Sequence, residues 1–163
     1  MQALLRLGLR FDALVKPRHL ASLLQFLRAW PELPVVIDHA AKPCLAEAWD
    51  GAAAWRSEMA EIASHPNVMC KFSGLLTEAP AAALRSHGAS LACLRPVWEA
   101  LLERFGPERL LWGSDWPVLT LAGDYAVWVA VSDSLIGELA AHEQAQVWHA
   151  NALRFYGLDP LAH

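Results

Sequence analysis

Short apolar segments alternate with longer amphipathic segments along the chain, and this alternation constrains the fold more than any other feature. The short segments end at Pro, Lys or Gly and are typical of buried strands; they cover residues 9–15, 35–40, 68–75 and 109–118. Apolar residues recur at helical spacing in residues 19–30, 52–64, 94–105, 124–136 and 143–156. Apolar strands separated by helices predict an α/β fold, in which about four βα units form a parallel sheet covered by helices.

Two local features refine this prediction. Pro96 is expected near the start of the helix at 94–105, because proline is tolerated in the first turn of a helix. Residues 76–90, which contain Pro80 and Gly88, are expected to form a loop or to be weakly helical.

The composition predicts one globular domain and excludes several classes of function. The chain has 163 residues, of which 55% are hydrophobic and 18% charged, so disorder is excluded. With a formal charge of −4, the chain lacks the excess of basic residues that is typical of a nucleic-acid-binding protein. No uncharged apolar run is long enough for a membrane span, and we interpret the N-terminal segment as mature chain rather than a signal peptide.

The three cysteines, Cys44, Cys70 and Cys93, are an odd number and contain no Cys-x-x-Cys pair. This pattern argues against a disulfide scaffold or a zinc ribbon and favours a reducing compartment. The expected location is therefore the cytoplasm.

Polar residues gather where three of the expected strands end. Function in α/β folds is carried by the carboxyl ends of the strands and the loops after them. The candidates at these ends are His39, Lys71, Ser73, Asp115 and Trp116. Side chains along a strand point alternately to the two faces of the sheet. The periodicity leaves open which of the two alternating sets faces inward, and hence whether these residues share one site.

Each candidate also has a structural interpretation. A histidine at a strand end is often only hydrogen-bonded, and Asp115 could cap a turn. Lys71 could pair with Asp38 or Glu78. The sequence contains no Gly-x-Gly-x-x-Gly, phosphate-binding loop, His-Glu-x-x-His or Gly-x-Ser-x-Gly motif, so it gives no support to the chemistry of those motifs.

Several runs together resemble one family. The runs are FDALVKPRHL (11–20), VVIDHAAKP (35–43), PNVMCKFSGLLTEA (66–79), FGPERLLWGSDWPV (105–118) and NALRFYGL (151–158). In this order they are similar to the C-terminal half of the amidohydrolase-related (amidohydrolase 2) proteins, in the branch that contains fuconolactonase-type and rhamnonolactonase-type enzymes. Each run alone is weakly specific, whereas the ordered set covers nearly the whole chain.

The resemblance implies the C-terminal half of a (β/α)₈ TIM barrel, with the four strands corresponding to strands five to eight. It places the histidine of strand six on His39, and the aspartate of strand eight, the general base, on Asp115. Lys71, Ser73 and Trp116 would bind or support the substrate. Family members open with a His-x-His pair, which these 163 residues lack. Residues 1–163 are therefore expected to be a single domain without the N-terminal half of the barrel.

The resemblance also implies a reaction and a set of partners. The expected activity is hydrolysis of a sugar lactone, with no required metal; if a metal such as zinc binds, His39 and Asp115 would be ligands. The expected partner is a small-molecule sugar lactone, not nucleic acid or a membrane. Two alternatives stay open: a metal-dependent hydrolase or decarboxylase, and a non-catalytic remnant or half-barrel subunit that self-associates or needs another chain.

Overall fold

A computed structural model describes residues 1–45 and 51–158 and contains one parallel sheet. Its strands are β1 (Phe11–Ala13), β2 (Val35–Ile37), β3 (Val68–Phe72) and β4 (Leu110–Trp112). The strands lie side by side in chain order, all parallel, so each connection is a crossover of the βα type. The predicted α/β fold with four βα units is confirmed.

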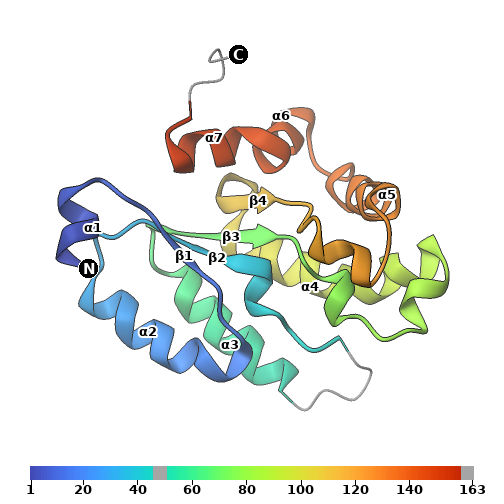
Figure 1. Ribbon diagram of the computed structural model, residues 1–163, viewed down its shortest axis with the longest axis horizontal. Helices are drawn as coiled ribbons and strands as arrows, with labels where there is room; N and C mark the ends of the chain where they lie inside the picture. The colour runs from blue at the N-terminus through green and yellow to red at the C-terminus, as the bar shows by residue number, and fades with distance from the viewer. Residues whose placement is uncertain (46–50, 159–163) are drawn as a thin grey trace.

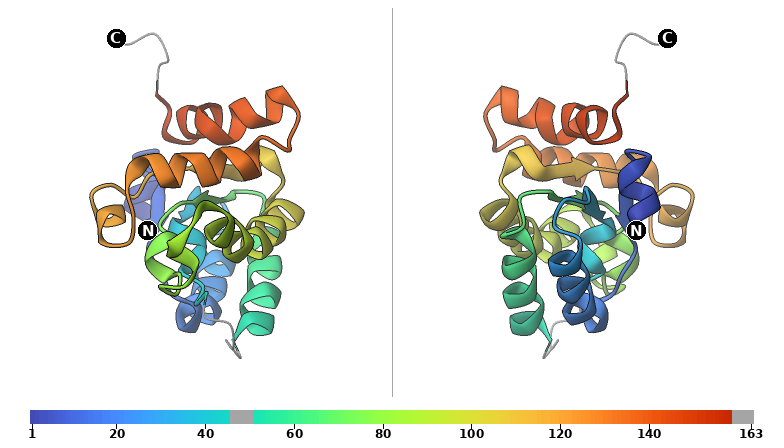
Figure 2. Two further views of the ribbon diagram at one scale, coloured as in Figure 1. Left: turned by 90° about the vertical axis from the view of Figure 1, so that its right-hand side faces the viewer. Right: turned by 90° about the vertical axis from the view of Figure 1, so that its left-hand side faces the viewer.

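Helices cover one face of the sheet and the last helix covers part of the other (Figure 1). The helices are α1 (Gln2–Arg6), α2 (Leu20–Ala29), α3 (Ala52–Ala63), α4 (His87–Phe105), α5 (Tyr125–Ile136), α6 (Ala141–Ala145) and α7 (Asn151–Tyr156). Figure 2 shows the same layers from two sides, with α6 and α7 across the sheet from α2 and α3.

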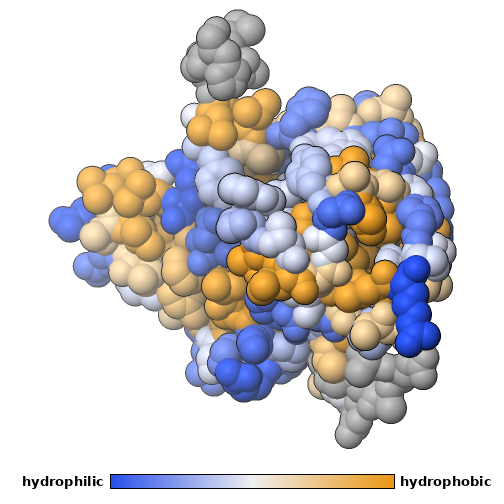
Figure 3. Space-filling model, turned by 45° about the vertical axis from the view of Figure 1, so that its right-hand side comes forward, coloured by the Kyte–Doolittle hydropathy of each residue, from blue (hydrophilic) through white to orange (hydrophobic). Residues whose placement is uncertain are grey.

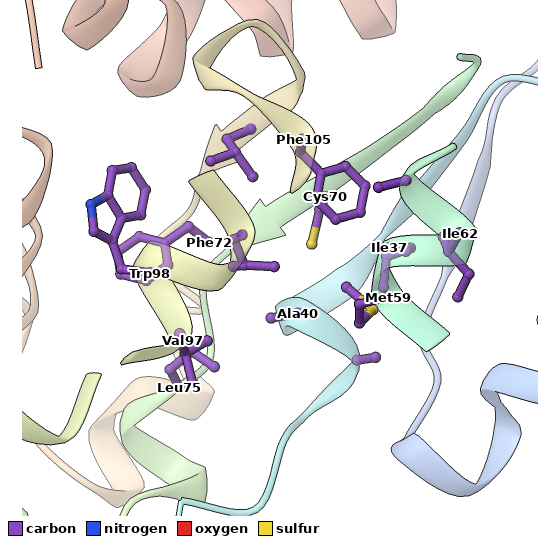
Figure 4. Packing of buried hydrophobic residues seen from close by; sticks show 14 of the residues in the cluster. Ile37, Ala40, Met59, Ile62, Cys70, Phe72, Leu75, Val97, Trp98 and Phe105 are labelled. Atoms are coloured by element: carbon purple, nitrogen blue, oxygen red, sulfur yellow. The ribbon is translucent and has the colours of Figure 1, made fainter. Parts of the chain in front are cut away.

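The main core lies between the sheet and helices α2 to α5. Ile37 of β2 and Phe72 of β3 point into it, and Figure 4 shows them beside Met59 of α3 and Trp98 of α4. Trp98 stacks at a tilt on Phe72, with ring centroids 4.9 Å apart. Side chains of opposite parity, Val36, Met69 and Leu111, form a smaller cluster with Phe155 of α7. Both faces of the sheet therefore bury apolar side chains, as the sequence predicts.

Several boundaries differ from the sequence prediction. The strands are shorter than the predicted runs, with β2 ending at Ile37 and β4 at Trp112. Helix α4 begins at His87, inside the segment expected to form a loop or to be weakly helical, because the Ser86 side chain accepts a hydrogen bond from the Ala89 amide and caps the helix. Pro96 consequently lies inside α4, where its missing amide proton leaves the Ala92 carbonyl without its helical donor. The last expected helix, at 143–156, is divided by a π-helical turn at Gln146–Ala150.

Candidate functional site

Three of the predicted site residues meet at the carboxyl edge of the sheet. His39 follows β2, Ser73 follows β3 and Asp115 follows β4. The Nδ1 atom of His39 lies 2.8 Å from Oγ of Ser73, and its Nε2 atom lies 3.5 Å from Oδ1 of Asp115. Because the strands are parallel and adjacent, their carboxyl ends bring together residues that are far apart in sequence; His39 and Ser73 are separated by 34 positions.

A left-handed turn (residues 39–42) presents His39. The φ angles of His39, Ala40, Ala41 and Lys42 lie between 52° and 60°. Non-glycine residues rarely adopt this conformation, which costs roughly 1–2 kcal/mol per residue. Asp115, at φ 58°, is the other non-glycine residue with positive φ in the part of the chain that the structure describes. Such backbone conformations cluster at functional sites, where the surroundings impose them.

Two contacts with residues outside the left-handed turn and one hydrogen bond within it hold its conformation. Lys42 forms an ion pair of 2.9 Å with Glu78, which lies in the loop after β3. The indole Nε1 of Trp55 donates a hydrogen bond of 3.0 Å to the Ala40 carbonyl, and Ala40 and Ala41 are buried. The Lys42 amide donates to the His39 carbonyl across the turn, at 2.7 Å. These contacts fix the backbone that aims the imidazole.

Gly74 gives the pair room to approach. Its φ is +61°, and a Cβ atom added there would lie 2.5 Å from His39 Nδ1 and 3.0 Å from Asp115 Oδ2. Any side chain at this position would therefore collide with the His39 ring and crowd the Asp115 carboxylate. Gly74 lies in the run 66–79 that resembles the family, but the sequence alone does not predict this close approach to His39.

The His39–Asp115 pair is largely shielded from water. The side chains are 17% and 12% exposed. Burial lowers the pKa of His39, an effect that the nearby Asp115 and Asp38 carboxylates oppose. The Oδ2 atom of Asp115 is buried and has no hydrogen-bond partner among the described residues. The arrangement can thus offer a neutral imidazole and, beside it, a carboxylate oxygen with free acceptor capacity.

Lys71 occupies a second cluster, on the face of the sheet that α7 covers. Its ammonium lies 2.7 Å from Asp12 and 2.7 Å from Asp38, and 5.5 Å from the centre of the Tyr156 ring. The predicted pairing with Asp38 is confirmed, whereas Glu78 pairs with Lys42 instead. The sequence did not predict Asp12 as a partner of Lys71; a carboxylate within the otherwise apolar β1 is the signal that points to it.

Trp116 is the fifth predicted residue and lies at the surface beyond β4, with 68% of the residue exposed. Its amide donates a hydrogen bond of 3.2 Å to Ser114 Oγ, and its peptide bond to Pro117 is cis. The structure thus places an exposed indole next in sequence to Asp115.

His39 and Asp115 alone supply too few ligands for a catalytic metal centre. Residues 1–45 and 51–158 contain no group of three or more His, Cys, Asp and Glu side chains placed to hold a metal ion. A catalytic zinc takes three protein ligands and a water, and His39 with Asp115 supplies two. Among the same residues, none of the helices is both long and apolar enough to span a membrane.

Comparisons with known proteins show the family of the chain. The family described as Amidohydrolase matches residues 1–158. An L-fucono-1,5-lactonase of Burkholderia ambifaria is 45% identical over 163 residues, which is 98% of this chain and 53% of that protein. An L-fucono-1,5-lactonase of Burkholderia multivorans is 39% identical over 154 residues, 91% of this chain and 51% of that protein. The chain therefore spans about half the length of the curated relatives that it matches.

A solved structure supports the predicted fold. It is an amidohydrolase from Burkholderia multivorans with bound zinc, 37% identical, with a TM-score of 0.89. The match covers 96% of this chain and 55% of that one. The resemblance that the sequence motifs indicate is confirmed, and the four βα units correspond to half of the barrel of these neighbours.

Proposed function

Since the chain belongs to the amidohydrolase family, we propose that it forms half of a barrel that hydrolyses a sugar lactone, with Asp115 as the general base. The observation that carries the proposal is the contact of the His39 ring with the Asp115 carboxylate, in loops with strained backbone at the carboxyl edge of a parallel sheet. The names of the lactonase relatives support the substrate class.

The proposed reaction adds water across the ester bond of the lactone. Asp115 takes a proton from water as the water oxygen bonds to the carbonyl carbon. The negative charge that develops on the carbonyl oxygen is stabilised by a hydrogen bond from the His39 ring. The ring C–O bond then breaks, and the departing oxygen takes the proton from Asp115. The product is an open-chain hydroxy acid.

The remaining residues have supporting roles in this proposal. The exposed indole of Trp116 forms a wall of the substrate site. Lys71 and Ser73, which were expected to touch substrate, contact carboxylates and His39 respectively, so we assign them to the support of the site. Sugar contacts come also from the half of the barrel outside this match, because substrate loops surround the whole carboxyl mouth.

One alternative has specific support. Bound zinc in the Burkholderia multivorans structure favours a metal-dependent hydrolase or decarboxylase, in which the other half of the barrel supplies the missing ligands. The other alternative stays open: a non-catalytic remnant, or a half-barrel subunit that needs another chain. Under each of them residues 1–163 act as one domain, and a cytoplasmic location stays a prediction.

The test combines this chain with the part of the Burkholderia ambifaria lactonase that it does not match. The two are assayed as a fusion and as separate chains, with L-fucono-1,5-lactone and other aldonolactones, by the acid released. We expect hydrolysis by the fusion and none by either part alone. An inactive fusion beside an active native relative would contradict the proposal. Activity that requires stoichiometric zinc would favour the metal-dependent alternative.

A further inference from the structure

Ser73 is buried, with 2% of the residue exposed, and its hydroxyl has one hydrogen-bond partner in residues 1–45 and 51–158, the Nδ1 atom of His39. A serine hydroxyl carries one proton and two acceptor lone pairs, and a neutral imidazole carries its proton on only one nitrogen. The proton between the two groups therefore belongs either to Ser73 or to His39.

The hydrogen-bond partners available to Ser73 separate these two arrangements. If Nδ1 carried the proton, Ser73 would accept it, and its own O–H would be left in a buried position without an acceptor. Leaving a buried donor unpaired is costly, and native structures avoid it. If Ser73 donates to Nδ1, its proton is paired and Nδ1 is satisfied.

The opposite side of the ring gives an independent argument. Nε2 of His39 lies 3.5 Å from Oδ1 of Asp115. An N–H directed at a carboxylate oxygen is attracted to it, whereas a nitrogen lone pair at the same distance is repelled. The lowered pKa of His39, which burial causes against the opposing carboxylates, favours the neutral ring to which both arguments apply.

We propose that Ser73 is a positioning residue: its hydroxyl donates to Nδ1 of His39 and holds the neutral ring in the tautomer that is protonated at Nε2, beside Asp115. The tautomer follows from the contacts of this chain alone. Its contribution to catalysis rests on the proposed function, in which Nε2–H is the donor to the lactone oxygen. In this state Nε2 has no free lone pair, so His39 is a hydrogen-bond donor and not a metal ligand.

The tautomer is measured on the full chain by the ¹⁵N chemical shifts of the His39 ring, assigned by comparison with His39→Gln. We expect the proton on Nε2 in the wild type and in Ser73→Thr, which keeps the hydroxyl. We expect a mixture of tautomers in Ser73→Ala. Ser132→Ala is the matched control, because Ser132 is also buried and accepts a bond of 2.8 Å from a ring nitrogen, that of Trp112. It should leave the His39 shifts unchanged.

A proton on Nδ1 in the wild-type chain would overturn the proposal. So would a Ser73→Ala chain whose ring stays fully protonated at Nε2, since Ser73 would then be unnecessary. If Ser73→Ala does not fold, the wild-type and Ser73→Thr spectra decide: a proton on Nε2 in both supports the proposal, and a proton on Nδ1 in either overturns it.

The catalytic part has a separate measurement in the active fusion. Ser73→Ala should lower kcat about 10- to 100-fold, the size of the effect when a partner that orients a metal-bound histidine is removed, and should leave KM nearly unchanged. An unchanged kcat would overturn the catalytic role. An inactive wild-type fusion would contradict lactone hydrolysis but not the tautomer, so the two failures are distinguishable.

Discussion

The ammonium of Lys71 on β3 lies 2.7 Å from a carboxylate oxygen of Asp12 on β1, although β2 separates the two strands. The same ammonium lies 2.7 Å from Asp38, at the end of β2. The phenol of Tyr156 on α7 donates to the Asp12 oxygen at 2.7 Å. One cation thus connects three strands, and through Tyr156 it connects them to the last helix.

Replacing Lys71 by Met should lower the free energy of unfolding by about 2 kcal/mol. Breaking a fully buried pair costs about 3–5 kcal/mol and an exposed pair about 0–1 kcal/mol, and Lys71, with 21% of its side chain exposed, is intermediate. Urea unfolding measures the change. Arg28→Met is the control, because Arg28 and its partner Glu61 are both well exposed. Equal losses in the two variants would contradict the special role of Lys71.

The same cluster should make stability fall at alkaline pH. Burial alone would lower the pKa of Lys71, but hydrogen bonds to Asp12, Asp38 and Tyr156 outweigh it and raise the pKa. The folded chain therefore keeps this proton after the unfolded chain has released it, above pH of about 10.4. The contribution of Lys71 is complete below that pH and is lost as pH rises through the folded pKa. Unfolding curves from pH 9 upward should show a smaller alkaline loss in Lys71→Met.

Gly74→Ala should destabilise the chain more than Gly8→Ala, a substitution in an open turn with similar φ. Positive φ costs an alanine roughly 1–2 kcal/mol, and the collision with His39 adds about 1–3 kcal/mol. Gly8→Ala is the matched control, since Gly8 has nearly the same φ, +63°, and nothing within 4 Å of an added Cβ. Thermal unfolding should show the larger loss for Gly74→Ala. Equal losses would mean that the loop relaxes away from His39.

The sequence predicts the βα units and the positions of the site residues, because short apolar runs and strand-end polar residues are local signals. The left-handed turn is not predictable in this way. Residues 39–42 contain no Gly or Asn, and the conformation depends on tertiary contacts such as Trp55 with Ala40 and Lys42 with Glu78. Asp12 was missed for a similar reason: only strand register places it within reach of Lys71.

The chain alone should self-associate. Strands β1 and β4 form the edges of the sheet and have one strand neighbour each among the described residues. Exposed edges recruit further strands, and apolar side chains reach the surface beside polar ones on the face in Figure 3. Light scattering at micromolar concentration should give a mass above the 17.9 kDa of one chain. Adding the unmatched part of the Burkholderia ambifaria lactonase should shift it to a one-to-one complex, whereas a clean monomer alone would contradict the prediction.

Asp115→Asn should abolish most of the lactone hydrolysis of the fusion without unfolding it. The amide keeps the shape of the carboxylate but cannot take a proton from water, and a general base contributes about 10²- to 10⁴-fold to the rate. We expect kcat to fall by that factor. Asp133→Asn, on the exposed side of α5, is the control and should leave kcat unchanged. Circular dichroism should show the same fold in all three proteins. Wild-type turnover in Asp115→Asn would exclude Asp115 as the base and direct the search to the other half of the barrel.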